Sequence, residues 1–207
     1  MSSIEENTKI DTKFCGNGGD VDIKLLVGKA KAGDRIAFNA IFTLYKQRIF
    51  AISIRYLHNE QDAADIVQET FLNALKFLYK FNEKSDISTW LVRICLNLCW
   101  QKRKHIAEKN KFEVSLDINY ENEEGDCVKQ VVSGEAQPHD ILEQQQESRR
   151  IRDILDSLKK KYRELIILKE LEGYSYEECA RILDISEGTV MSRLHRARKI
   201  LIKKLSG

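Results

Sequence analysis

The chain has 207 residues, 32% of them charged, and a formal net charge of only +2. This length suits one domain or two small ones. No apolar run approaches the roughly 20 residues of a membrane-spanning helix, and residues 1–20 lack the apolar core of a signal peptide. The five cysteines are odd in number and have no framework spacing, which favours reduced thiols in a cytoplasmic protein over a disulfide scaffold.

Residues 1–20 have no apolar periodicity and are expected to form a flexible tail. From residue 21 to about residue 111 the apolar spacing predicts four amphipathic helices in a compact bundle. Gly33 is suited to end the first helix, and Asp34 and Asn59 to cap the second and third. The fourth helix is expected to start near Ser88 and to run out in the basic residues 102–111. The third helix is expected to direct these residues inward: Ala64, Val67, Phe71, Ala74, Leu75 and Leu78.

The composition changes abruptly after residue 111. Residues 112–147 contain ten acidic residues and one basic residue, Lys129, and Gly125, Gly134 and Pro138 interrupt the chain. Such a segment cannot bury enough apolar surface to fold alone. We therefore expect a flexible acidic linker over residues 112–140.

Helical periodicity resumes at about residue 141 and predicts a second bundle. Its first apolar positions are Ile151, Ile154, Leu155 and Leu158, followed by Leu165, Ile166, Leu168 and Leu171, with Gly173 as a stop signal. The bundle ends in two helices joined by a tight turn at 184–186. Ser175 and Glu178 have the spacing of a capping box for the first, and Ser186 can cap the second.

The second of these two helices has an apolar stripe and a basic outer side. Val190, Leu194 and Ala197 recur at spacings of three and four residues. A helix-turn-helix whose second helix carries cations and hydrogen-bonding groups is the arrangement that enters a DNA major groove. The sequence therefore predicts DNA binding, although an ordinary helical hairpin with a solvated face is the alternative. The outer side carries Ser192, Arg193, His195, Arg196, Arg198 and Lys199.

Two further patterns lie in the first bundle. Asp62, Asp65 and Glu69 share one stripe of the third helix, which either is simply solvated or faces a basic protein partner. Aromatic residues are interleaved with cations over 77–104, a pattern typical of single-strand binding. Burial in the core is the alternative for these aromatic residues, and it is favoured for Trp90. The basic run at 102–104 is expected to contact phosphate.

Catalytic and metal-binding patterns are absent from the sequence. Cys95 and Cys99 are four residues apart, but no histidine or cysteine completes a ligand set, so they are expected to be small core thiols. There is no phosphate-binding glycine loop and no nucleophile–base pair. We expect no enzyme activity, no metal and no cofactor.

Five stretches in order resemble the extracytoplasmic-function (ECF) sigma factors of bacterial RNA polymerase. They are AGDRIAF (32–38), DAADIVQETFLNA (62–74), TWLVRICLN (89–97), LKELEGYSYEECA (168–180) and GTVMSRLHRARK (188–199). The resemblance implies an all-α protein of two small helical bundles joined by the flexible acidic linker, the C-terminal bundle containing the helix-turn-helix. Residues 21–111 would be sigma region 2 and residues 141–207 sigma region 4.

The resemblance also implies roles for individual residues. Core polymerase would bind through the clamp coiled coil of its largest subunit to Asp62, Asp65, Gln68 and Glu69. The −10 element would be recognised and melted by Lys80, Asn82, Lys84, Arg93, Asn97, Lys102 and Arg103. The −35 element would be recognised by Ser175, Tyr176, Glu187, Thr189, Met191, Ser192, Arg193, His195, Arg196, Arg198 and Lys199.

The implied function is to direct RNA polymerase to the promoters of a stress or envelope regulon. The partners would be core polymerase, double- and single-stranded promoter DNA and an anti-sigma factor, possibly membrane-bound. Met191 stands where the family often has lysine or arginine, and Gln101 replaces a frequent aspartate. The alternative is a free-standing helix-turn-helix transcriptional regulator, which would bind an operator tightly without polymerase. A third class, a protein that only sequesters polymerase or a sigma factor, does not explain the basic helix.

Overall fold

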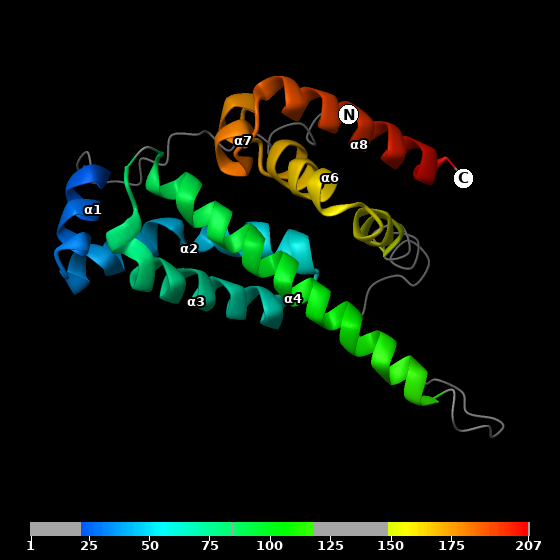
Figure 1. Cartoon of the computed structure of the whole chain (residues 1–207), viewed down its shortest axis with the longest axis horizontal. Helices are drawn as coiled ribbons and strands as arrows, with labels where there is room; N and C mark the ends of the chain where they lie inside the picture. The colour runs from blue at the N-terminus through cyan, green and yellow to red at the C-terminus, as the bar shows by residue number, and fades with distance from the viewer. Residues whose placement is uncertain (1–21, 84, 118–148, 207) are drawn as a thin grey trace, which may run out of the picture. The chain divides into compact units, whose positions relative to one another are not determined.

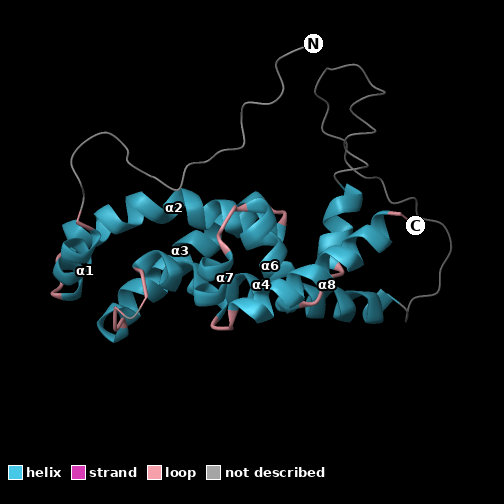
Figure 2. Cartoon of the chain, turned by 90° about the horizontal axis from the view of Figure 1, so that it is seen from above, coloured by secondary structure: helices cyan, strands magenta, loops and turns pink. Residues whose placement is uncertain are grey.

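The computed structural model describes residues 22–83, 85–117 and 149–206, and all regular structure in these ranges is helical (Figures 1 and 2). The all-α prediction is therefore confirmed. Residues 149–156 are also helical. The remaining elements are α1 (Ile23–Lys31), α2 (Arg35–Leu57), α3 (Glu60–Phe77), the 3₁₀ turn η1 (Leu78–Lys80), α4 (Ile87–Asp117), α6 (Lys160–Leu165), the π-helix η2 (Ile166–Leu171), α7 (Tyr176–Leu183) and α8 (Glu187–Leu205).

The chain divides into two compact units, one ending at Ile41 and the other beginning at Phe42. In the first unit, α1 ends before Gly33, whose φ of 95° is the left-handed conformation that glycine adopts without strain. The Asp34 side chain accepts hydrogen bonds from the backbone of Ile36 and Ala37 at 2.8 and 3.2 Å. The expected end of α1 and the expected cap of α2 are both confirmed.

In the second unit, α3 packs against α4. Asn59 caps α3 by accepting from the Asp62 backbone N–H at 2.8 Å, as expected. Ala63, Ile66 and Thr70 are buried, and so are four of the six positions expected to face inward: Val67, Phe71, Ala74 and Leu78. Ala64 is exposed, and so is Leu75, at 52%. Alanine at both 63 and 64 leaves the sequence pattern compatible with either face.

The fourth helix is longer than expected. It runs from Ile87 to Asp117 and so continues through the basic residues and into the first six residues of the expected linker. Lysine, arginine and glutamate are good helix formers, which explains why a highly charged stretch can extend a helix. The expected tail and the rest of the expected linker lie outside the described residues.

The C-terminal helices form the expected helix-turn-helix. α8 packs on both α6 and α7, and its Val190, Leu194 and Ala197 are at most 1% exposed. Ile151 and Leu171, by contrast, were expected inside and are 45% and 40% exposed. In place of an ordinary apolar stripe, the segment around η2 buries the four consecutive residues 165–168.

Hydrogen bonds at the two helix starts fix the turn of the helix-turn-helix. Ser175 accepts from the Glu178 backbone N–H at 3.1 Å, and the Glu178 carboxylate accepts from the Ser175 backbone N–H at 2.7 Å, so the capping box is confirmed. Ser186 caps α8 by accepting from the Thr189 backbone N–H at 3.3 Å. Between them, Asp184 has a φ of 55°, which turns the chain sharply.

Candidate nucleic-acid and protein interfaces

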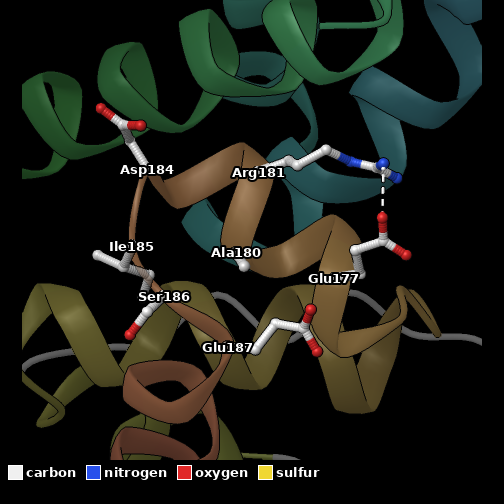
Figure 3. A pocket seen from close by; sticks show the side chains of 7 residues that line it. All are labelled: Glu177, Ala180, Arg181, Asp184, Ile185, Ser186 and Glu187. Carbon is white, nitrogen blue, oxygen red and sulfur yellow. Dashed lines mark hydrogen bonds and ion pairs between the residues drawn. The ribbon is translucent and has the colours of Figure 1, made fainter.

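An open hollow of about 490 Å³ lies at the turn between α7 and α8 (Figure 3). Ala180 faces it from α7, and Glu187 from the first turn of α8. On its rim, Arg181 pairs with Glu177 at 3.0 Å, one helical turn away. The small side chain at 180 and the short turn leave the start of α8 accessible, as a helix that enters a groove requires.

The outer face of α8 is exposed. Met191 is 51% exposed, and five further side chains are exposed too: Ser192, His195, Arg196, Arg198 and Lys199. Ser192 donates its hydroxyl hydrogen to the Thr189 carbonyl at 3.1 Å and keeps its acceptor capacity. Within the described ranges, Arg196 and Lys199 form no ion pair. These side chains can therefore meet a ligand without breaking an internal ion pair.

Arg198 differs from its neighbours because it is paired with Glu170 of η2. Its Nε and Nη2 donate to Glu170 Oε1 at 3.1 and 2.6 Å. Arg193 is half-buried. Ser175, Glu187, Thr189 and Tyr176 complete the set expected at the −35 element. All four lie at the starts of α7 and α8, the first two exposed and the last two half-buried.

The aromatic residues before α4 are largely internal. Phe81 is 5% exposed and lies against half-buried Trp90, with ring centroids 5.2 Å apart, so the core assignment favoured for Trp90 is supported. Tyr79 is the exception, at 68% exposed. Lys80 Nζ lies 5.5 Å from the Tyr79 ring centroid and 5.4 Å from that of Phe77. Asn82 is exposed beside them, and Lys84 lies outside the described residues.

The expected −10 contacts on α4 are all engaged by other parts of the second unit. Arg93 donates from Nε to the Ile182 carbonyl at 3.0 Å and from Nη2 to the Arg181 carbonyl at 2.6 Å. Asn97 Oδ1 accepts from Lys160 Nζ at 3.4 Å. Two further cations form ion pairs: Lys102 with Asp62 at 2.8 Å, and Arg103 with Asp156 at 2.5 Å.

The acidic stripe of α3 is exposed along most of its length. The Asp65 side chain is 60% exposed, and Gln68 and Glu69 are exposed as well. Asp62 is more covered, at 24%, because Lys102 binds it and also lies 3.8 Å from Asp65. The hydrogen bond to Asp62, with the charges of Asp62, Asp65 and Glu69, raises the pKa of Lys102. The stripe therefore already holds one cation.

An apolar hollow borders this stripe, and the sequence analysis missed it. It measures about 380 Å³ and lies between α2 and α3, next to Gln68. Ala64, which was expected to be buried, is exposed and lines it. The spacing of Phe42 and Phe50 on α2 was the signal for it. Its other lining residues are Lys46, Gln47 and Val67.

The two helical cysteines are fully buried core thiols, as expected. Their Sγ atoms are 3.9 Å apart, and Ser53 Oγ lies 3.3 Å from Cys95 Sγ. The hydrogen bond with Cys95 and burial raise the pKa of Cys99, so this thiol stays protonated at neutral pH. In the described ranges, no three histidine, cysteine or acidic side chains are grouped to hold a metal ion. No helix in those ranges is long and apolar enough to cross a membrane.

Comparison with known proteins gives two family matches and several full-length relatives. The model of sigma-70 region 2 matches residues 41–106, and that of sigma-70 region 4 matches residues 148–201. The chain is 35% identical to the ECF RNA polymerase sigma factor SigW of Bacillus subtilis over 184 residues, 88% of this chain and 96% of that one. It is 31% identical to the ECF RNA polymerase sigma-E factor of Escherichia coli over 186 residues, 88% and 93% of the two chains.

Solved structures agree on the fold. CnrH, in complex with the cytosolic domain of CnrY, aligns with a TM-score of 0.60 at 24% identity, over 90% of this chain and 98% of that one. The sigma factor RpoE of Bartonella quintana, in complex with the anti-sigma factor NepR, aligns with a TM-score of 0.52 at 25% identity, over 82% and 96%. With near-complete coverage at 35% identity and both regions present in order, this chain belongs to the ECF sigma factors of RNA polymerase.

Proposed function

We propose that this sigma factor recognises the −35 element through α8 and the −10 element through η1, the following loop and α4. The observation that carries the proposal is the outer face of α8, where Ser192 and Arg196 are exposed beside the short turn. Arginine and serine can hydrogen-bond base edges in the major groove, whereas Arg193, Arg198 and Lys199 suit phosphate. In this proposal, region 2 spans residues 21–111 and region 4 spans residues 141–207.

Core polymerase binds, in this proposal, to the acidic stripe of α3 formed by Asp62, Asp65, Gln68 and Glu69. Carboxylates repel phosphate, so exposed carboxylates on a protein that must approach DNA are better explained by a basic protein partner than by DNA contact. Each DNA-binding region alone binds weakly, because polymerase supplies the fixed spacing that lets both act together. The chain itself is a non-enzymatic initiation factor that acts in the cytoplasm with its polymerase. An anti-sigma factor is a further partner, by analogy with the RpoE–NepR complex.

The test is run-off transcription on genomic fragments with bacterial core polymerase, with and without the protein. We expect defined transcripts only when both are present, and their start sites give the −35 and −10 sequences. Tight binding of the protein alone to DNA, without stimulated transcription, would instead support the free-standing regulator.

The polymerase interface is tested by Glu69→Lys. Placing a cation opposite a basic partner costs several kcal/mol, so holoenzyme assembly should weaken at least tenfold. Glu60→Lys is the matched control, since nine residues along a helix place Glu60 on the opposite side of α3. Both variants should keep their helical content. Equal assembly by the two variants, measured by fluorescence titration with core polymerase, would remove Glu69 from the interface.

A further inference from the structure

One lysine of α4 reaches across to the acidic stripe of α3. Lys102 Nζ lies 2.8 Å from Asp62 Oδ1 and 3.8 Å from Asp65 Oδ2. Lys102 follows Cys95 by seven residues and Cys99 by three, and both cysteines are fully buried. This spacing places Lys102 on the side of α4 that faces the core. The contact between Lys102 and the stripe is therefore built into the packing of α4 on α3.

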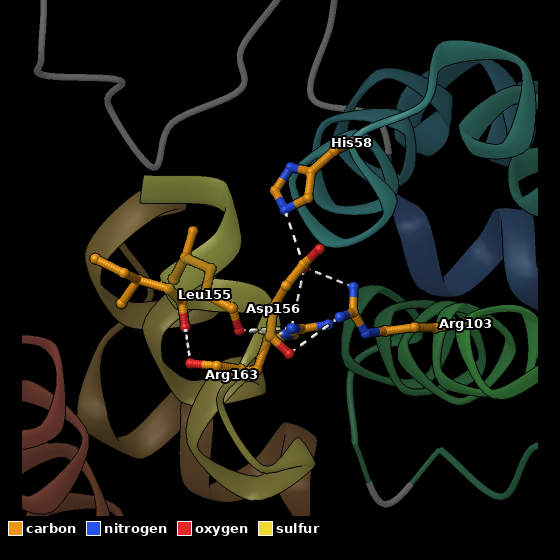
Figure 4. A network of polar contacts seen from close by, with 7 residues as sticks. His58, Arg103, Leu155, Asp156 and Arg163 are labelled. Carbon is orange, nitrogen blue, oxygen red and sulfur yellow. Dashed lines mark hydrogen bonds and ion pairs between the residues drawn. The ribbon is translucent and has the colours of Figure 1, made fainter. Parts of the chain in front are cut away.

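The two cations that follow Lys102 are paired elsewhere. Arg103 binds the Asp156 carboxylate at 2.5 Å (Figure 4). Lys104 pairs with Glu108, one helical turn along α4, at 3.5 Å. Of the charged side chains that the structure describes, Lys102 is thus the cation paired with the stripe.

Lys102 changes the charge that the stripe presents. The hydrogen bond to Asp62 and the charges of the stripe raise the pKa of Lys102, so its ammonium group is charged at neutral pH. The stripe has three carboxylates, those of Asp62, Asp65 and Glu69. Three carboxylates and one ammonium give a net charge of −2 in place of −3. A basic partner therefore meets a weaker attraction than the carboxylates alone would exert.

The compensation is uneven along the stripe. Asp62 lies in the first turn of α3, where the helix dipole already favours a carboxylate, and it is the closer partner of Lys102. Asp65 is more exposed and farther from the ammonium group. Glu69 is exposed and forms no ion pair within residues 22–83, 85–117 and 149–206. The end of the stripe at Glu69 is therefore the most open to a cation of a partner.

We propose that Lys102 is an internal counter-ion that limits how strongly the acidic stripe binds core polymerase. This inference rests on the proposed binding of polymerase to the stripe. A cation of the partner that approaches Asp62 or Asp65 must displace Lys102 or meet its repulsion. The Lys102–Asp62 pair is partly exposed, and pairs of this kind contribute little to folding, so the exchange leaves the helices in place. Lys102 acts through the two aspartates as a positioning residue of the interface.

The test removes the charge of Lys102 and keeps the length of its side chain. Lys102→Met is titrated, as the full-length protein, into fluorescently labelled core polymerase at low and at high salt. No DNA is present, so the proposed −10 contact of Lys102 does not enter the measurement. Lys102→Arg keeps the charge. Lys104→Met is the matched control, because it removes an exposed cation of the same helix that is paired with Glu108 and not with the stripe.

We expect Lys102→Met to bind core polymerase about fivefold more tightly than wild type at low salt, the effect of one unit charge about 4 Å away in water. Salt screens exposed charges, so the gain should shrink at high salt. Lys102→Arg and Lys104→Met should both stay within about twofold of wild type at either salt concentration.

Equal or weaker binding by folded Lys102→Met, in a series where Glu69→Lys still weakens assembly, would overturn the counter-ion role and leave the stripe as the polymerase site. Equal assembly by Glu69→Lys and Glu60→Lys would instead reject the stripe itself. A gain that is the same at both salt concentrations would come from the methionine side chain and not from the lost charge, and it would also overturn the proposal. Circular dichroism checks the fold, and Lys102→Gln carries the same measurements if Lys102→Met loses helical content.

Discussion

The outer faces of α8 and α4 are both rich in cations, yet they are in different states. On α8, Arg196 and Lys199 are exposed, and in the described part of the chain they form no ion pair. On α4, Arg93, Lys102 and Arg103 each bind a carbonyl or a carboxylate of another helix. Cations alone therefore do not mark an available nucleic-acid surface. In the proposed function, the face of α8 meets duplex DNA without breaking an ion pair, whereas the cations of α4 must first leave their present partners.

The largest expected effect comes from removing a buried side chain through which α8 packs on the neighbouring helices. Leu194 is 1% exposed beneath the basic face, so Leu194→Ala should cost about 2–5 kcal/mol of folding free energy through lost burial and a cavity. Promoter binding by holoenzyme should fall with it. Ile202→Ala, on the same helix but 64% exposed, is the control and should change stability by less than about 0.5 kcal/mol. Urea denaturation followed by circular dichroism measures both. Equal losses would mean that Leu194 does not anchor α8.

Substitution of Arg196 tests whether an exposed cation of α8 recognises bases. Arg196→Ala should cost about 1–3 kcal/mol of promoter affinity and relax preference at one −35 position. Arg196→Lys keeps the charge but loses the bidentate fork, so it should relax the preference almost as much. Binding of holoenzyme to a set of −35 variants measures both effects. A lysine variant with wild-type preference would reassign Arg196 to a phosphate contact.

The features predicted correctly from sequence are those with local causes. Asp34, Asn59, Ser175 and Ser186 cap their helices because a short polar side chain reaches an N–H two or three residues away. The exposed face of α8 was predictable for the same reason, since its apolar stripe fixes which side is outward.

The features that were missed depend on residues far apart in the chain. The internal contacts of Arg93 and Arg103 were not predicted, because their partners lie 88 and 53 positions away, where no spacing rule reaches. Arg163 and Glu164 are charged and consecutive, yet both are buried, 2% and 7% exposed, because the partners that permit this come from packing. The length of α4 was missed because charged residues were taken to mark a helix end.

The smallest expected effect is a pH dependence of folding stability. It distinguishes the paired cations of α4 from the exposed cations of α8. Burial raises the pKa of Asp156, but the hydrogen bonds from His58 and Arg103 and the nearby guanidinium charges outweigh burial and lower that pKa. The contribution of Asp156 to stability is therefore fully present above the unfolded value of about 3.9 and is lost as pH falls below it. About a third of the side chain is exposed, so solvent screening should keep the contribution below about 1 kcal/mol. Urea denaturation at pH 6 should therefore show wild type more stable than Asp156→Asn, and the difference should be smaller at pH 3. Asp153→Asn, at an exposed position of the same helical segment, is the matched control and should show no such convergence. An equal stability difference for Asp156→Asn at both pH values would mean that the shape of the Asp156 side chain, and not its charge, holds Arg103 and His58. The cations of α4 would then change partners without an electrostatic cost.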